Sequence, residues 1–189
     1  MATFIRPEAV PNPLEDDALI DAMQATVVGV TGLDPTLVRP RNQPAPPNLP
    51  DFSLNWASLG LTVTDSDSYA FVRQVNDTDM ELEHDQEITL LAIFYGSSAQ
   101  SYVGLLRDGL QIEQNRWALG ALGVKLVSTG RERHIPSLLK EIWQQRYDLP
   151  VVWRRRVRRV YKSASVIGVS LGLDNEHYIT PIVVSPPTP

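Results

Sequence analysis

Residues 88–96, ITLLAIFYG, decide the fold of this 189-residue chain. Nearly every position is apolar or small, and the run ends at a glycine, which is typical of a fully buried strand. The segment Ser97-Ser98-Ala99-Gln100 follows, and apolar residues then recur at the spacing of a helix that covers a sheet, namely Ala99, Tyr102, Val103, Leu106 and Leu110. The junction therefore predicts a sheet with a helix packed on it.

The flanking sequence extends this prediction in both directions. An acidic start and helical apolar spacing predict a helix within residues 13–32, ending near Gly29 or Gly32. Shorter helices are expected over 113–122 and, as one or two turns with Trp143 as a core anchor, over 137–145. Strands are expected over 52–64, 69–83, 124–128 and 147–161, with a closing hairpin formed by 166–173 and 178–184. The predicted fold class is α+β, a mostly antiparallel β-sheet with helices packed on one face.

Proline density sets the expected domain organisation. Six prolines fall between residues 34 and 50, where they remove backbone donors and disfavour a helix or a central strand. Residues 1–50 are therefore predicted to form a separate N-terminal part, made of the N-terminal helix and an extended, proline-rich connector. Residues 51–185 form the predicted α+β core domain, and residues 186–189 form a disordered tail.

The composition and the motifs of the chain argue against a catalytic site or a metal site. The chain has no cysteine, which excludes disulfides, zinc thiolates and cysteine nucleophiles. His84, His134 and His177 lie in separate contexts, and the sequence has no glycine-rich phosphate loop or serine nucleophile elbow. The alternating carboxylates of residues 81–87 suit a solvated strand face better than a metal site. We expect a non-enzymatic, soluble and unprocessed protein without a cofactor, a metal or a membrane segment.

Charge is divided unequally along the chain. Residues 1–100 hold 15 acidic and 4 basic side chains, a net charge of −11, whereas residues 101–189 hold 7 acidic and 13 basic side chains, a net charge of +6. Two interpretations stay open. The halves neutralise each other within one chain, or opposite faces of neighbouring copies meet head to tail, as in a closed ring.

An arginine-rich run in the last long strand is the sharpest local feature. Its members are Arg154, Arg155, Arg156, Arg158 and Arg159. On a strand these side chains fall on both faces, and an unpaired buried guanidinium is costly. The strand is therefore expected to be an edge strand or to face another subunit, and its arginines are candidates for a subunit interface or a channel lumen. Nucleic-acid binding is the competing interpretation, disfavoured by the acidic pI of about 5.2 and by the lack of a recognition helix.

Taken in order, these segments resemble the phage neck and tail terminator proteins of long-tailed bacteriophages. The resemblance runs through the acidic helix, the connector from Val38-Arg39-Pro40 and the strand end Phe94-Tyr95-Gly96. It continues through positions further along, namely Ala99, Leu106, Leu110, Arg116, Leu119, Gly123, Leu126, Leu138, Leu139, Trp143 and Arg146. The arginine-rich strand departs from the milder strand of that family.

The resemblance implies a virion structural protein made in the host cytoplasm. It implies a ring, typically a hexamer, that caps the tail tube and joins it to the head connector. Its partners would be copies of itself, tail tube and sheath proteins, connector proteins, and DNA that passes through the lumen without sequence-specific binding. A head-completion adaptor at the portal, in a twelve-membered ring, and a DNA-binding accessory protein are the alternatives.

Overall fold

The computed structural model describes residues 5–8, 14–43, 49–66, 69–76, 78–139 and 141–162. The predicted hairpin over 166–184 and the predicted tail at 186–189 lie outside these residues. The order of the main sheet is β1-β2-β4-β9-β5, with β3 also paired to β4 and β6 to β9. Its strands are β1 Val38–Pro40, β2 Trp56–Asp65, β3 Phe71–Gln74, β4 Asp79–Tyr95, β5 Val124–Thr129, β6 Arg133–His134 and β9 Arg146–Lys162.

The sheet is mixed, with one parallel pair. β1 runs parallel to β2, and the other pairings are antiparallel. β1 is the short edge strand that the proline-rich connector forms, since Pro40 has no N–H to donate to a further neighbour. The predicted α+β class is confirmed.

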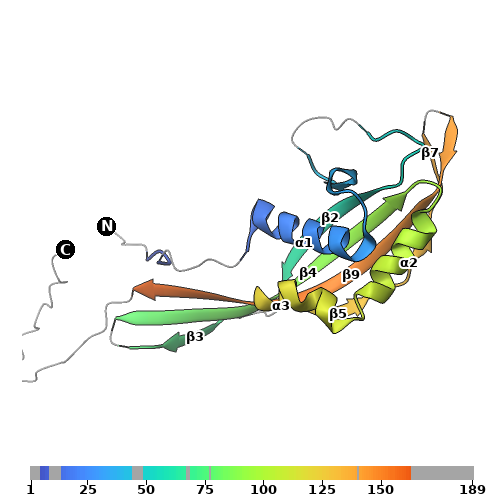
Figure 1. The fold of residues 1–189 in the computed structure, drawn as a ribbon. Coiled ribbons are helices and arrows are strands. Elements are labelled where there is room, and N and C mark those ends of the chain that lie inside the picture. The colour runs from blue at the N-terminus through green and yellow to red at the C-terminus, as the bar shows by residue number, and fades with distance from the viewer. Residues whose placement is uncertain are drawn as a thin grey trace, which may run out of the picture.

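Two long strands form the axis of the molecule. β4 and β9 have 17 residues each and pair from Asp79↔Lys162 to Tyr95↔Arg146. Their far ends, together with β3, extend beyond the helices as a projection (Figure 1), which we call the arm and define as residues 71–74, 79–87 and 154–162. The predicted break between the strand at 69–83 and the strand at 88 is wrong: residues 79–95 form one continuous strand, because alternating polar residues continue β4.

Helices cover one face of the sheet, as predicted (Figure 1). They are α1 Asp16–Thr31, α2 Ala99–Gly109 and α3 Trp117–Ala121, with 3₁₀ turns at Pro35–Leu37 and Glu113–Arg116. Apolar side chains of α1 and α2 form one core with those of β4 and β9, including Leu19, Met23, Val27, Val103, Leu106, Ile88, Leu90, Phe94, Leu149, Val151 and Trp153. We call this side of the sheet the helix face and the other side the open face.

The glycine that ends the buried strand is required by close backbone packing. Gly96 has φ 109°, and a Cβ there would lie 2.5 Å from Oδ1 of Asn55 and 2.8 Å from the carbonyl oxygen of Leu54. The same Asn55 oxygen accepts a hydrogen bond of 2.8 Å from the N–H of Ser98, just before α2. The strand therefore turns sharply onto the helix, as the sequence predicted.

Residues 137–145 do not form helical turns, so that prediction is wrong. They form a hairpin of β7 Ser137–Leu139 and β8 Ile142–Gln144, in which Leu138 pairs with Trp143. The turn contains Glu141 with φ 64°. Apolar residues at 138, 139, 142 and 143 satisfy both helical spacing and cross-strand pairing, so periodicity alone could not decide. Trp143 is 70% exposed and is not the predicted core anchor.

Candidate subunit interface

The open face of the arm carries a ladder of opposite charges on paired strands. The alternation of β4 places the carboxylates of residues 79, 81, 83 and 85 on one face of the sheet. Three of them lie opposite a base of β9, and Glu81 lies opposite Val160. Lys162 lies 2.6 Å from Asp79, Arg158 2.7 Å from Glu83, and Arg156 2.9 Å from Asp85. Glu81, only 5% exposed, also pairs with Arg158 at 2.7 Å and with Arg73 of β3. The ladder therefore joins all three strands of the arm.

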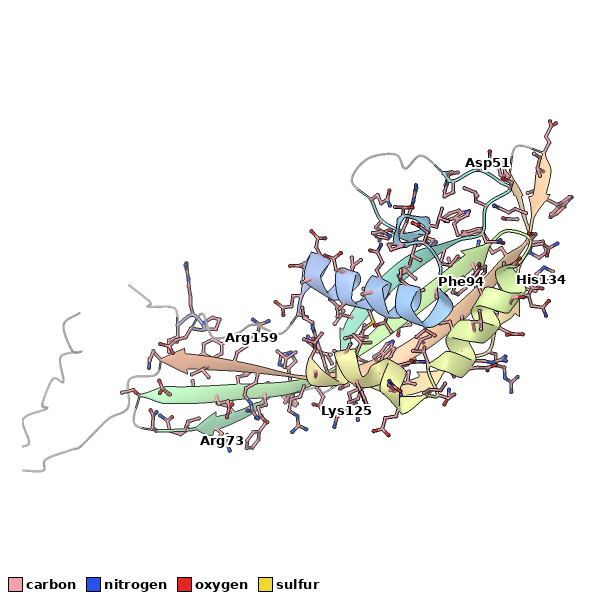
Figure 2. The ribbon with its side chains drawn as sticks, viewed as in Figure 1. Asp51, Arg73, Phe94, Lys125, His134 and Arg159 are labelled. Atoms are coloured by element: carbon pink, nitrogen blue, oxygen red, sulfur yellow. The ribbon has the colours of Figure 1, made fainter. Side chains whose placement is uncertain are left out.

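The helix face holds the other two arginines of the run. Arg155 is 4% exposed and donates to Oε1 of Gln86 at 3.0 Å and to the carbonyl oxygen of Leu14. Arg159 pairs with Glu15 at 2.6 Å. Burial lowers the pKa of Arg155 below its ordinary value, while the Glu15 charge acts in the opposite direction. These contacts fasten the segment that leads into α1 onto β9; Figure 2 labels Arg159 on the arm.

The position of the arginine-rich strand differs from the expected edge. β9 lies between β4 and β5 at Arg154 and Arg155, and only from residue 156 onward does β4 alone pair with it as a long strand. There Pro7 bridges to Tyr161, and the N–H of Glu8 donates to the carbonyl oxygen of Val160 at 2.8 Å. Guanidiniums are tolerated on both faces because carboxylates and carbonyls of the same chain pair with them.

Arg154 differs from the other four arginines of the run. It is exposed on the open face, and no described residue forms an ion pair or hydrogen bond with it. Its register partner on β5 is Lys125, also exposed. The part played by all five arginines in a subunit interface or lumen stays a prediction. Glu87 lies opposite Arg154 on β4, and the charge of Arg154 contributes to lowering the pKa of Asp85, yet Arg154 is the one of the five that forms no ion pair or hydrogen bond with a described residue.

We expect acid to weaken the strand pairing of the arm before it weakens the part of the sheet that the helices cover. Hydrogen bonds from Arg156 hold the pKa of Asp85 below its ordinary value, and a hydrogen bond from Lys162, then one from Asn76, does the same for Asp79. A carboxylate whose pKa is lower in the folded than in the unfolded protein stabilises the fold at any pH above its unfolded pKa, which is about 3.9 for aspartate. This stabilisation is lost as the pH falls through the pKa of the folded protein. As the pH falls below about 4, amide exchange corrected for intrinsic rate should rise at residues 79–87 more than in α2. Equal rises in both regions would contradict this account.

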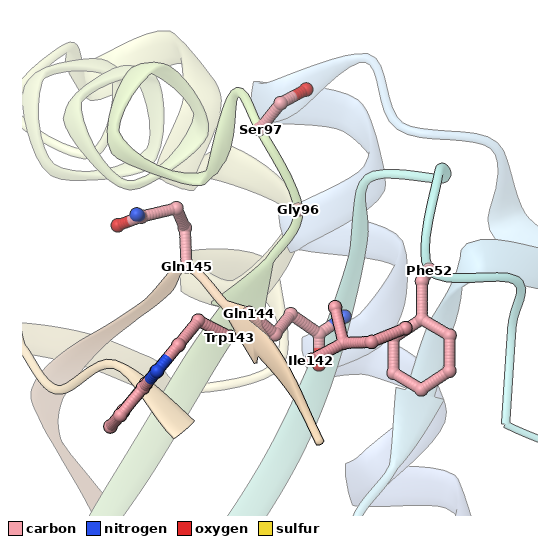
Figure 3. A pocket seen from close by; sticks show the side chains of 7 residues that line it. All are labelled: Phe52, Gly96, Ser97, Ile142, Trp143, Gln144 and Gln145. Carbon is pink, nitrogen blue, oxygen red and sulfur yellow. The ribbon is translucent and has the colours of Figure 1, made fainter. Parts of the chain in front are cut away.

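The opposite end of the molecule carries exposed apolar residues on the β7–β8 hairpin. A shallow cavity of about 210 Å³ lies there, lined by Phe52, Gly96, Ser97 and residues 142–145. Figure 3 shows Ile142 pointing toward Phe52, while Trp143 points to the other side of the hairpin. Arg146, beside this hairpin, donates hydrogen bonds of 2.7 Å to both carboxylate oxygens of Asp148.

The arm also exposes apolar residues that were not among the predicted interface candidates. Tyr69 is 91%, Phe71 63% and Val72 50% exposed, on or beside the outer strand β3. The available signal was the short apolar run of β3 between two polar turns, which suits an edge strand. Both ends of the subunit therefore present apolar side chains to solvent, as surfaces that bind other proteins often do.

The residues that could bind a metal ion or take part in catalysis do not come together in the described structure. Among the described residues, no group of three or more His, Asp or Glu side chains is placed to hold a metal ion. His134 stacks on Tyr147 with ring centroids 4.5 Å apart, His84 lies on the arm, and His177 is outside the described residues. In that same part of the chain, no helix has the length and apolar character needed to cross a membrane.

Comparison with known proteins gives one family match. A family model described as phage neck terminator protein matches residues 17–179, a span that includes the whole main sheet and, apart from Asp16, the described helices. No curated protein matches the chain. A solved structure titled "Virion of native gene transfer agent (GTA) particle" is similar, with 19% identity and a TM-score of 0.32. The similarity covers 76% of this chain and 99% of that one.

Proposed function

We infer the role of this protein from its family, because the chain belongs to the phage neck terminator proteins. The family is one of structural virion proteins, so the chain is a structural component of the phage neck. The match over residues 17–179 is the single observation that carries this conclusion. It also agrees with the resemblance that the order of sequence segments indicates.

We propose that this protein is a tail terminator, a subunit of a ring that caps the tail tube and joins the tail to the head connector. The elongated shape supports the proposal, since the arm and the β7–β8 hairpin lie at opposite ends and both expose apolar residues (Figure 1). Different surfaces that meet between identical copies form a heterologous contact, which closes into a ring when the rotation allows. We propose six copies, with tail tube, sheath and connector proteins as neighbours and DNA passing through the lumen.

Purified protein added to tail tubes during their assembly tests this role. We expect it to bind one end of each tube and stop growth, and electron microscopy should count six copies there. Binding along the tube wall, or tubes that grow at the same rate with and without the protein, would contradict a terminator. A twelve-membered ring that binds the portal instead would identify the adaptor.

The ladder on the arm weakens the DNA-binding alternative. Arg156 and Arg158 are engaged by carboxylates of β4, so these guanidiniums carry less free charge toward a phosphate backbone. We therefore propose that DNA passes the protein without being held by this strand. Salt-sensitive retention of duplex DNA that depends on Arg156 and Arg158 would restore the alternative.

A further inference from the structure

We propose that Arg154 and Lys125 of one copy form ion pairs with the acidic beginning of α1 of the next copy, at Asp16, Asp17 and Asp21. The proposal rests on the proposed ring and names one of its contacts. Its basis is two exposed charged surfaces on opposite faces of one sheet. Lys125 and Arg154 on one surface, and Asp16, Asp17 and Asp21 on the other, form no ion pair among the residues that the structure describes. We call them the basic hollow and the acidic turn.

The basic hollow lies on the open face, at the base of the arm. Its lining includes Lys125, Arg154 and Arg156, with Val127 and Leu126 beside them and Asp85 as the one carboxylate, in a volume of about 560 Å³. Arg156 is paired with Asp85 at 2.9 Å. Glu87 lies opposite Arg154 on β4, but neither Arg154 nor Lys125 forms an ion pair with a described residue, so both can pair with an anionic partner. Figure 2 labels Lys125 near the base of the arm.

The acidic turn lies on the helix side of the sheet. Asp16, Asp17 and Asp21 are all exposed, and within the described part of the chain none forms a hydrogen bond or ion pair through its side chain. Two acids in the first turn favour the helix dipole. Asp17 and Asp21, however, are four residues apart on one face, an arrangement that destabilises a helix by about 0.2–0.5 kcal/mol. A cation supplied from outside the chain would relieve that repulsion.

The fold prevents these surfaces from meeting within one subunit. β9 buries Trp153 and Arg155 toward the helices, so the alternation of the strand turns Arg154 to the other side of the sheet. α1 packs on the helix face through Leu19, Met23 and Val27. A contact between the basic hollow and the acidic turn must therefore join the open face of one copy to the helix face of another. Such a contact repeats in one direction, as a ring requires.

A second copy explains this pair of surfaces better than a nucleic acid does. Nucleic acid would use the basic hollow and leave the acidic turn without a role, whereas a second copy uses both. The carboxylates of a helix are also small enough to enter a shallow hollow beside Val127. We expect the ion pairs to set orientation and association rate, and apolar contacts to supply most of the affinity.

Charge reversal tests the contact. We prepare the full chain as Arg154→Glu with Lys125→Glu, as Asp17→Lys with Asp21→Lys, and as the combination of all four. Sedimentation velocity over a concentration series measures assembly. Each pair should weaken assembly by about tenfold or more, which corresponds to about 1.4 kcal/mol. The combination should recover wild-type assembly to within about threefold, and added salt should weaken the wild type more than either pair.

The control is Asp108→Lys, which reverses an exposed acid on α2, away from both surfaces, and should leave assembly unchanged. Thermal unfolding of each variant checks that the subunit remains folded. If the wild type forms rings and the Arg154 and Lys125 pair does too with equal affinity, the contact is refuted while the proposed function stands. Loss of duplex DNA retention with normal assembly also refutes it, in favour of a phosphate contact. If the wild type never assembles, even on tail tubes, the proposed function itself fails.

Discussion

Replacing Trp153 with alanine is expected to lower the free energy of unfolding by about 3–5 kcal/mol. The side chain has no solvent exposure and lies in the core that β9 shares with the helices. It sits opposite Ile88, the first residue of the stretch that decides the fold. Its removal leaves a large cavity between the sheet and the helices, because the rigid strands on either side cannot collapse into it. Urea unfolding followed by circular dichroism measures the effect.

Trp153→Phe is the matched control. The indole N–H of Trp153 is buried, and no described group accepts a hydrogen bond from it. Phenylalanine keeps most of the apolar volume and removes this unpaired donor, so it should cost far less than alanine. An alanine variant as stable as the wild type would show that Trp153 is not part of the core. A phenylalanine variant as damaged as alanine would show that the indole nitrogen does have a partner.

Replacing Arg155 with glutamate should destabilise the subunit by about 3–5 kcal/mol, because it buries an unpaired carboxylate. The guanidinium is 4% exposed and reaches Gln86 and the carbonyl oxygen of Leu14. A carboxylate has no proton to donate to that carbonyl and would face Glu15 nearby. We expect the beginning of α1 to detach first, which urea unfolding and proteolysis near residue 14 would detect.

Arg154→Glu is the adjacent control on the same strand. Arg154 points to the open face and is exposed, and a glutamate there would lie opposite Glu87, so the change should destabilise the isolated subunit by no more than about 1 kcal/mol. Arg155→Met separates the loss of volume from the loss of charge, and should cost less than Arg155→Glu. Equal destabilisation by the glutamate at 154 and at 155 would contradict the assignment of these residues to opposite faces.

The fold was predictable where the spacing of hydrophobic residues fitted only one kind of secondary structure. Residues 88–96 and the helix from Ala99 gave the sheet, its covering layer and the glycine turn, because burial of a continuous apolar run allows few arrangements. The break predicted before residue 88 was wrong because the polar residues of β4 lie on an arm without a covering helix. The hairpin at 137–144 was missed because its apolar positions fit two periods.

The residues of the candidate site could be predicted from the sequence, but not which carboxylate pairs with which arginine. The sequence identified the arginine run and its two faces, and it left open whether the acidic half neutralises that run within the chain or between copies. The register of β4 against β9 places Asp85 opposite Arg156, Glu83 opposite Arg158 and Glu87 opposite Arg154. Ion pairs within the chain form at Arg156 and Arg158, and Arg159 pairs with Glu15. Register depends on residues about 70 positions apart, so local patterns do not determine it. Arg154 retains its predicted role between subunits only as a proposal.

The central claim is that this protein acts by assembling through its surfaces into a closed ring at the neck. Mass measurement and electron microscopy of the purified full chain, alone and with tail tubes, test it most directly. We predict a single closed species of six copies that binds one end of the tube. A protein that stays monomeric at high concentration and on tubes would contradict the claim.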